Sequence, residues 1–344
     1  MKYKIGFVGF GKRAKSTYFP MIKQAHSLLS VVGFHVRNAE KGKNIALENN
    51  IEFFVHARDL LEKAPDCLVV SVPYTAQHEV LKSLGPFDGT ILVDTPVMDP
   101  RMTRDFPNVG VIEQWPYLPL EQFKNIIYES GKIERPFFVQ NDCRSLDYHA
   151  ISKLRTYVGR EHFPATIASQ GLAVPMPAFI DKSGNKREEP ESWDMGLVKM
   201  TNGAVMSHNF SYNCKAAPFR MVHTLRGYSR NGTIITGMID EKDNDYEKID
   251  IRYLEGTETK HADVVINRTP SGSITTIEDK NSDLVWINRF SEFDLTDHQV
   301  AIAEIIVSAC EGKVCYTTRD SLVDSTVIAA IRQSAHQEVV WRFD

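Results

Sequence analysis

A glycine turn near the start of the chain constrains its fold more than any other feature. The apolar run Lys4–Val8 leads directly into Gly9-Phe10-Gly11-Lys12-Arg13-Ala14. In such a strand–turn–helix, Gly9 permits a tight turn, Gly11 lets the backbone approach a pyrophosphate, and Ala14 lets the helix pack closely on the strand. The free N–H groups of the helix then favour phosphate. We therefore predict a dinucleotide-binding turn formed by Gly9, Phe10, Gly11, Lys12 and Arg13.

Strands and helices alternate through the first third of the chain. The expected order is strand Leu28–Phe34, helix Asn38–Glu48, strand Ile51–Val55, helix Asp59–Lys63, strand Cys67–Pro73, helix Thr75–Leu84 and strand Thr90–Asp94. This alternation predicts a doubly wound parallel sheet with helices on both faces. Ligands of such sheets bind at the carboxyl ends of the strands, which places Pro73, Asp94 and Thr95 beside the cofactor groove.

The pattern changes beyond about residue 135, where antiparallel strands and two closing helices are expected. The strands are Ala204–Tyr212, Met221–Gly227, Gly232–Ile239, Lys248–Leu254 and His261–Ile266, and the helices are Asp297–Glu311 and Arg319–Gln337. We predict an α/β protein with a nucleotide-binding domain at 1–120 and, at 121–344, an α+β substrate domain with a large, mostly antiparallel sheet. Its open sheet face predicts a homodimer or homotetramer, since bare sheet faces tend to be buried.

The composition of the chain limits the kinds of molecule that it is expected to bind. The chain has 40 basic and 44 acidic residues and a net charge of -4, which argues against nucleic acid and anionic membranes. No apolar run is long enough to span a bilayer, and the start of the chain shows no signal peptide. Five cysteines without CxxC spacing and eleven histidines without HxH or HExxH spacing give no metal site. We expect a cytoplasmic protein that acts on a small molecule.

The end of the second strand bears on cofactor choice. Dehydrogenases specific for NAD place a carboxylate on the ribose here, but this chain has none before Glu40. Arg37, together with Lys12 or Arg13, could instead pair with a 2′-phosphate. The alternative is an ordinary surface arginine in a loop. We predict NADP in preference to NAD.

The order of motifs resembles that of the Gfo/Idh/MocA oxidoreductases along nearly the whole chain. The motifs are Gly6-x-x-Gly9-x-Gly11, Val72-Pro73 followed by His78, Val93-Asp94-Thr95-Pro96 in place of Glu-Lys-Pro, and Asp147-Tyr148-His149-Ala150-Ile151. The resemblance implies an NAD(P)-dependent oxidoreductase acting on sugars, inositols, sugar nucleotides or related molecules. It implies cofactor contacts from Val72, Pro73, His78 and Asp94, and an active-site histidine at His149.

Departures from the family pattern bear on catalysis. The family lysine that helps to move a proton is replaced by Thr95, whose hydroxyl hardly ionises but can hydrogen-bond a carbonyl, the nicotinamide amide or local backbone. His149 becomes the leading acid or base because its ordinary pKa lies near neutrality. Asp147 or Tyr148 could orient its ring or relay a proton. Lys153 could replace the missing lysine, although an exposed helical lysine is the favoured interpretation.

Two functions from different classes remain. The first is an oxidoreductase, with reduction favoured, that transfers hydride between the nicotinamide and a carbonyl, alcohol or imine carbon. His149 or Tyr148 would supply the proton and Thr95 would hold the substrate. The second is a non-catalytic cofactor-binding regulator or partner subunit on the same scaffold. The altered catalytic positions fit the second, and the intact glycine turn fits both.

Overall fold

A computed structural model describes residues 2–143, 145–180, 184–188, 190–211, 223–238, 248–334 and 341–342. The chain forms two compact units. Unit 1 comprises Met1–Leu120, Ile266–Thr276 and Ile287–Leu322, and unit 2 comprises Glu121–Val265, Ile277–Trp286 and Val323–Asp344. Two segments of the expected second domain, residues 266–276 and 287–322, thus belong to the first unit.

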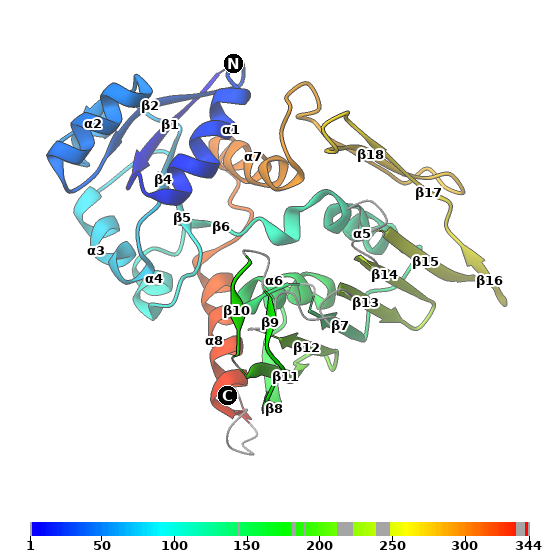
Figure 1. The fold of residues 1–344 in the computed structure, drawn as a ribbon. Helices are drawn as coiled ribbons and strands as arrows, with labels where there is room; N and C mark the ends of the chain where they lie inside the picture. The colour runs from blue at the N-terminus through cyan, green and yellow to red at the C-terminus, as the bar shows by residue number, and fades with distance from the viewer. Residues whose placement is uncertain are drawn as a thin grey trace. The chain divides into compact units, whose positions relative to one another are not determined.

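Unit 1 contains a six-stranded parallel sheet in the order β3-β2-β1-β4-β5-β6 (Figure 1). Its strands are β1 (Tyr3–Val8), β2 (Leu29–His35), β3 (Phe53–Phe54), β4 (Cys67–Val70), β5 (Thr90–Asp94) and β6 (Gly110–Ile112). All four residues of the central strand β4 are buried, as a strand covered on both faces requires. The predicted doubly wound fold is confirmed.

The helical segments of unit 1 begin with a π-helical turn directly after the glycine turn. They are η1 (Ala14–Tyr18), α1 (Phe19–Gln24), α2 (Ala39–Asn49), η2 (Asp59–Lys63), α3 (Tyr74–Leu84), α4 (Pro100–Asp105), η3 (Trp115–Tyr117) and α7 (Asp297–Cys310). Asn38 caps α2, since its Oδ1 accepts the Lys41 N–H at 2.8 Å. Thr296 and Gln299 form a capping box on α7.

Unit 2 is built on a nine-stranded sheet in the order β16-β15-β14-β13-β7-β12-β11-β8-β20. The pair β7–β12 is parallel and the other neighbouring pairs are antiparallel. The strands are β7 (Phe138–Asp142), β8 (Pro164–Val174), β11 (Glu191–Met200), β12 (Val205–Ser211), β13 (His223–Ser229), β14 (Gly232–Met238), β15 (Lys248–Glu255), β16 (Glu258–His261) and β20 (Trp341–Arg342). The predicted mostly antiparallel second sheet is confirmed.

Three helices complete unit 2: α5 (Pro119–Glu129), α6 (Asp147–Val158) and α8 (Thr318–Ser334), whose first turn belongs to unit 1. Two small sheets remain, β9 (Phe179–Ile180) with β10 (Lys186–Arg187), and β17 (Val264–Arg268) with β18 (Ile274–Asp279) and β19 (Val285–Ile287). Helix α8 packs closely on β11, because a Cβ on Gly196 would lie 2.6 Å from the Ile331 side chain. None of the helices in the described ranges has the length and apolar character that a bilayer span requires.

The strand predicted at His261–Ile266 is wrong. His261 ends β16, and Val264 begins β17 in a different sheet. The Ala262 N–H donates to the Ile251 carbonyl, whereas the Asp263 carbonyl accepts the Lys280 N–H. The chain therefore changes partner strand between these two residues. The predicted element ends at Tyr212, Met221, Ile239 and Gln337 lie outside the described residues.

Candidate functional site

The two glycines of the first turn serve different purposes. Gly9 has a φ of +87°, and a Cβ there would lie 2.3 Å from the Ser71 carbonyl oxygen. Its N–H donates to the His35 carbonyl at 2.8 Å, which ties the turn to β2. A Cβ on Gly11 would meet no atom within 4 Å. Gly9 is thus required by the fold, whereas Gly11 leaves open space beside the backbone.

That space belongs to a cavity of about 500 Å³ at the carboxyl ends of β1, β2 and β4. Its lining residues are Val8, Gly9, Phe10, Gly11, His35, Val36, Arg37, Lys41, Ala57, Ser71, Val72, Pro73, Ala76, Glu79, Val80 and Ser83. Six of the predicted cofactor residues are among them: Gly9, Phe10, Gly11, Arg37, Val72 and Pro73. Lys12, Arg13, His78, Asp94 and Thr95 are not.

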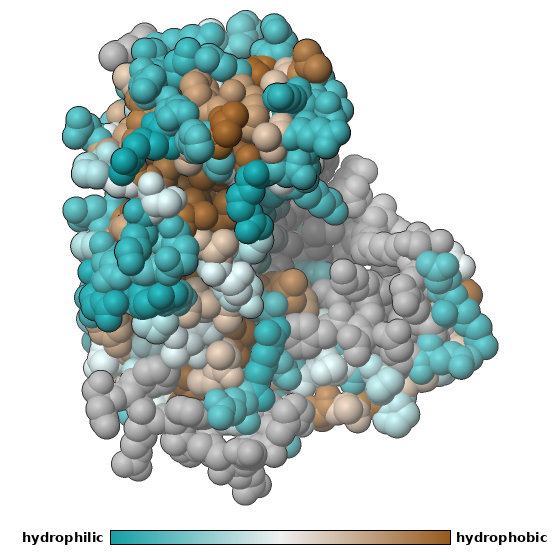
Figure 2. All heavy atoms as spheres, turned by 90° about the vertical axis from the view of Figure 1, so that its left-hand side faces the viewer, coloured by the Kyte–Doolittle hydropathy of each residue, from teal (hydrophilic) through white to brown (hydrophobic). Residues whose placement is uncertain are grey.

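Figure 2 views unit 1 from the side of α2 and α3, where apolar residues lie between hydrophilic ones. The α2 side of the cavity carries Arg37 and Lys41, two exposed cations. Glu40 instead lines a second hollow, together with Lys15, Asn38 and other residues of α2 that include Lys41. The α2 side of the cavity therefore presents positive charge, which favours an anionic ligand group. Lys41 was not predicted from the sequence as a cofactor residue. Its position in the first turn of the helix that follows the second strand could have indicated this role.

Arg13, which was predicted to pair with a cofactor phosphate, instead contacts three protein side chains. Its Nε lies 3.0 Å from Asp94 Oδ1 and donates to the Tyr18 hydroxyl at 2.8 Å, and its Nη2 donates to Gln114 Oε1 at 2.9 Å. Tyr18 in turn donates to Asp94 Oδ1 at 2.7 Å. Burial raises the pKa of the Asp94 carboxyl, although Arg13 and Tyr18 oppose the shift. Arg13 thus ties the glycine turn to the end of β5. Lys12 is exposed and lies outside the cavity lining.

Asp94 connects this cluster to the cavity and to Thr95. The Ser71 hydroxyl, from a residue that lines the cavity, donates to Asp94 Oδ2 at 3.3 Å. The Thr95 N–H donates to Asp94 Oδ1 at 3.1 Å, and the Thr95–Pro96 peptide is cis. Thr95 is half-buried, and its hydroxyl makes no hydrogen bond among the described residues. The Thr95 hydroxyl therefore remains available as a donor next to the carboxyl end of β5.

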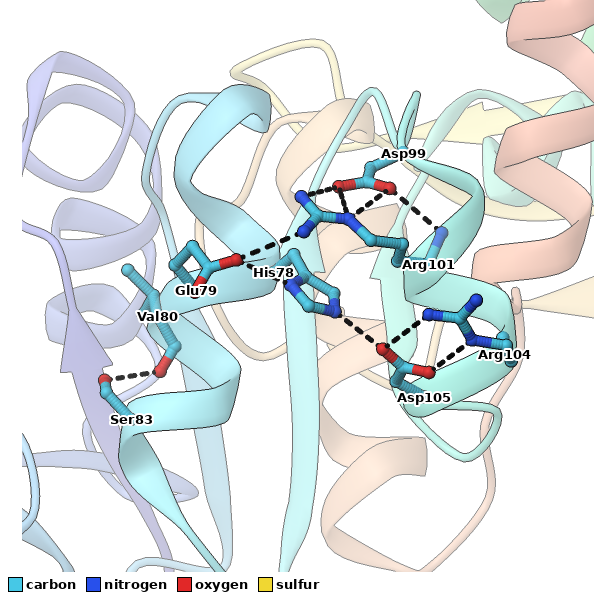
Figure 3. Close-up of polar contacts among 8 residues, drawn as sticks. All are labelled: His78, Glu79, Val80, Ser83, Asp99, Arg101, Arg104 and Asp105. Atoms are coloured by element: carbon cyan, nitrogen blue, oxygen red, sulfur yellow. Dashed lines mark hydrogen bonds and ion pairs between the residues drawn. The ribbon is translucent and has the colours of Figure 1, made fainter.

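His78 belongs to a charge network between α3 and α4, formed by His78, Glu79, Asp99, Arg101, Arg104 and Asp105 (Figure 3). Its Nε2 lies 2.8 Å from Asp105 Oδ2 and its Nδ1 lies 3.1 Å from Glu79 Oε1. Ionised carboxylates only accept, so both ring nitrogens donate and the ring is protonated in this arrangement. The hydrogen bond to Asp105, then that to Glu79, raises the pKa of His78. The predicted cofactor contact of His78 is therefore at most indirect, through Glu79.

Unit 2 holds the predicted acid–base residues at the start of α6. Asp147 has a φ of +50° and accepts a hydrogen bond from Arg332. The rings of Tyr148 and His149 lie 4.3 Å apart between centroids, and all three side chains are half-buried. The predicted trio is thus held on one helical turn, with Asp147 anchored to α8 and the two rings in contact. Ser145, four residues before His149, is buried, and its N–H donates to Asn141.

Lys153 is buried, so the expectation of an exposed helical lysine is wrong. Its side chain is 1% exposed, and its Nζ lies 3.1 Å from Glu121 Oε1. Lys124 approaches the same carboxylate at 3.0 Å. Burial opposes ionisation of Glu121, but these two ammonium groups hold its pKa below the usual range. Lys153 therefore belongs to a buried charge cluster formed by residues of α5 and α6. Within the described ranges, no group of three or more His, Cys, Asp or Glu side chains is arranged so that it could hold a metal ion.

The geometry of unit 1 fits a nicotinamide dinucleotide. Gly11 provides room for phosphates, two cations stand on the α2 side, and the rest of the lining is largely apolar. The fold and the cavity together define the class of dinucleotide-binding Rossmann proteins. Residues 3–105 match the family GFO_IDH_MocA, described as an oxidoreductase family with an NAD-binding Rossmann fold. The match covers this N-terminal region, and there the predicted resemblance to the Gfo/Idh/MocA family is confirmed.

Several solved structures share this fold over nearly the whole length of this chain and of their own. An NAD binding oxidoreductase from Klebsiella pneumoniae is 12% identical, with a TM-score of 0.68 and 99% of each chain covered. The WlbA dehydrogenase from Bordetella pertussis, in complex with NADH and UDP-GlcNAcA, is 15% identical, with a TM-score of 0.64 and coverage of 100% and 99%. The transcriptional regulator Gal80p from Kluyveromyces lactis is 12% identical, with a TM-score of 0.68 and coverage of 99% and 94%. No curated protein matches the sequence.

Proposed function

We propose that this chain is an NADP-dependent oxidoreductase that reduces a carbonyl or imine carbon of a small polar substrate, such as a sugar or sugar nucleotide. The observation that carries the proposal is the cavity of unit 1, in which Gly11 leaves space for phosphates and Arg37 and Lys41 stand together on one side. NAD is the alternative cofactor, and its binding would require the ribose hydroxyls to be held without a carboxylate from Glu40.

The chemistry needs one proton for each hydride. A bound reduced nicotinamide supplies the hydride to the substrate carbon, and the substrate oxygen or nitrogen takes up a proton. Thr95 supports reduction because its hydroxyl can donate a hydrogen bond to a carbonyl oxygen, whereas it cannot remove a proton from an alcohol near neutrality. His149 is the proposed proton donor, with Tyr148 in contact with its ring. Asp147, anchored by Arg332, positions the turn that carries both.

A fluorescence titration with NADPH and NADH tests cofactor choice. We expect tighter binding of NADPH, and a loss of about tenfold in NADPH affinity for each of Arg37→Ala and Lys41→Ala, because each removes one charge-assisted hydrogen bond to a phosphate. Affinity for NADH should change little. Lys43→Ala, which removes an exposed cation from the same helix but lies outside the cavity, is the matched control. Tighter NADH binding by the wild-type chain would contradict the NADP assignment.

Turnover is tested with NADPH against a panel of ketoses, sugar nucleotides, ketones and imines. We expect His149→Ala to lower kcat by at least about a hundredfold, as removal of a general acid does, while NADPH affinity is retained. If Tyr148→Phe lowers kcat instead and His149→Ala does not, the proton comes from Tyr148.

A regulator is the second candidate function. The fold is shared with Gal80p, a transcriptional regulator, and the sequence resemblance implies that Thr95 replaces the family lysine. This alternative predicts NADPH binding without turnover on any substrate of the panel, and no effect of His149→Ala.

We also propose that the chain forms a homodimer or homotetramer through the open face of the nine-stranded sheet. Leu172 and Leu197 are exposed there, on the face opposite to that on which Gly196 meets α8. Exposed apolar side chains on a broad sheet face favour association. Light scattering should give a multiple of the chain mass of 39.0 kDa, and Leu197→Asp should shift it toward the monomer. A monomeric wild-type chain would contradict this proposal.

A further inference from the structure

The α3 side of the cavity presents hydrogen-bond acceptors. The Ser83 hydroxyl donates its only proton to the Val80 carbonyl oxygen at 2.7 Å (Figure 3), so its oxygen can only accept a further hydrogen bond. Glu79 lines the same side. Its Oε1 accepts from Arg101 and His78, and among the described residues its Oε2 has no partner. The other cavity-lining residues of this helix are Ala76 and Val80, which are apolar.

The Glu79 carboxylate is oriented by two neighbouring cations, which also set its charge. Arg101, which holds Glu79 at 3.3 Å, is itself paired with Asp99 at 2.7 Å, and His78 is held by Asp105 (Figure 3). The hydrogen bond from His78, with the nearby positive charge of Arg101, lowers the pKa of Glu79. Near neutrality the carboxylate is therefore ionised and offers no donor. A ligand carbonyl oxygen placed on this side of the cavity would therefore be repelled by the negative charge on the oxygens of Ser83 and Glu79.

The cavity is thus divided by chemistry. Cations stand on the α2 side, acceptors stand on the α3 side, and Val36, Ala57 and Val72 supply apolar lining. A ligand that satisfies all three parts carries an anionic group, a flat apolar ring and an amine donor on that ring. The adenosine 2′-phosphate part of a dinucleotide has this order of groups, with the exocyclic amine at the 6-position of adenine.

We propose that Ser83 and Glu79 determine the base specificity of the cofactor site by accepting hydrogen bonds from the exocyclic amine of adenine. This inference rests on the proposed dinucleotide function and adds the part of the ligand that α3 recognises. Hypoxanthine has a carbonyl oxygen in place of that amine, so its acceptor would face the acceptors of α3. A purine with an oxygen at the 6-position is therefore disfavoured by electrostatics and not by size.

The test compares two dinucleotides on the full chain. The affinities of the tighter-binding reduced cofactor and of its hypoxanthine analogue are measured by fluorescence titration, which requires no substrate. We expect the wild-type chain to prefer the adenine form by about tenfold. Ser83→Ala should reduce the preference about threefold. Glu79→Gln, whose amide can donate to the hypoxanthine oxygen, should abolish or reverse it.

Glu62→Gln is the matched control, since it removes an exposed carboxylate of η2 that lies outside the cavity lining and should leave the preference unchanged. Equal affinity of the wild-type chain for the two dinucleotides, or an unchanged preference in both variants, overturns the base assignment alone. Failure to bind either dinucleotide overturns the proposed function and this inference together.

Discussion

In unit 1 the charge network between α3 and α4 lies at the surface, whereas in unit 2 the ion pair between Arg155 and Asp324 is buried. The Arg101 and Glu79 side chains are 49% and 64% exposed, but those of Arg155 and Asp324 are 1% and 2% exposed. Exposed pairs are weak because water and salt screen them. A buried pair costs much more to break, since the remaining charge has no solvent. The same types of residue thus adjust a binding surface in one unit and specify the fold in the other.

The largest expected effect comes from breaking the buried pair of unit 2. Arg155 Nη1 lies 2.8 Å from Asp324 Oδ1. Arg155→Met leaves that carboxylate buried without its cation, and we expect a loss of about 3–5 kcal/mol in the free energy of unfolding. Urea unfolding followed by circular dichroism measures this. The double variant Arg155→Met, Asp324→Asn removes the charge as well and should recover part of the loss. A loss below about 1 kcal/mol in the single variant would remove the contrast between the units.

An intermediate effect is expected at Arg13, whose pair with Asp94 is partly buried. Arg13→Gln removes the cation that faces Asp94 and should cost about 1.5 kcal/mol, because hydrogen bonds to a charged group are lost while solvent still reaches the site. The same urea measurement applies. Lys15→Gln, which breaks the exposed pair with Glu48, is the control and should cost less than about 0.5 kcal/mol. An equal loss of unfolding free energy in the two variants would show that burial does not determine how much each ion pair stabilises the fold.

The smallest effect is expected at His78 and depends on pH. The pKa of His78 is raised in the folded chain above its ordinary value of 6.5. The stabilisation by its two carboxylate partners is therefore fully present below 6.5 and is lost as the pH rises through the folded pKa. The difference in Tm between wild type and His78→Gln should shrink between about pH 6 and about pH 9. A difference that is constant over this range would mean that His78 acts through packing on Phe106 and not through charge.

Local patterns predicted the elements of unit 1 well. The segment Thr90–Asp94, with its apolar centre, forms β5 with the predicted limits, and Asn38 caps α2 where its side chain and the following helical pattern indicate. In unit 2, however, β7 pairs in parallel with β12 across more than sixty residues, and no turn marks that pairing in the sequence. Strands β8 and β11 also lack a short hairpin that would reveal them.

Side-chain partners that are distant in sequence limited the prediction of the site. The cavity lining from Gly9, Gly11 and Val72 follows from strand ends and glycine spacing. The engagement of Arg13 depends on Asp94 and Gln114, eighty or more positions away, and the burial of Lys153 depends on Glu121 from another helix. An isolated basic residue in a sequence gives no sign of such a partner, so the sequence predicts a phosphate contact for Arg13 and an exposed position for Lys153.

The return of residues 287–322 to unit 1 has a consequence for biosynthesis. The edge strand β6 is bound by this late segment, since the Val111 N–H donates to the Tyr316 carbonyl at 2.8 Å and Gly110 forms a bridge with Thr317. A nascent chain that has emerged only as far as residue 120 holds all six strands, but the outermost one still lacks these bonds. The first unit to leave the ribosome is therefore among the last to be finished, and a shortened gene ending after β6 should yield a product prone to aggregate.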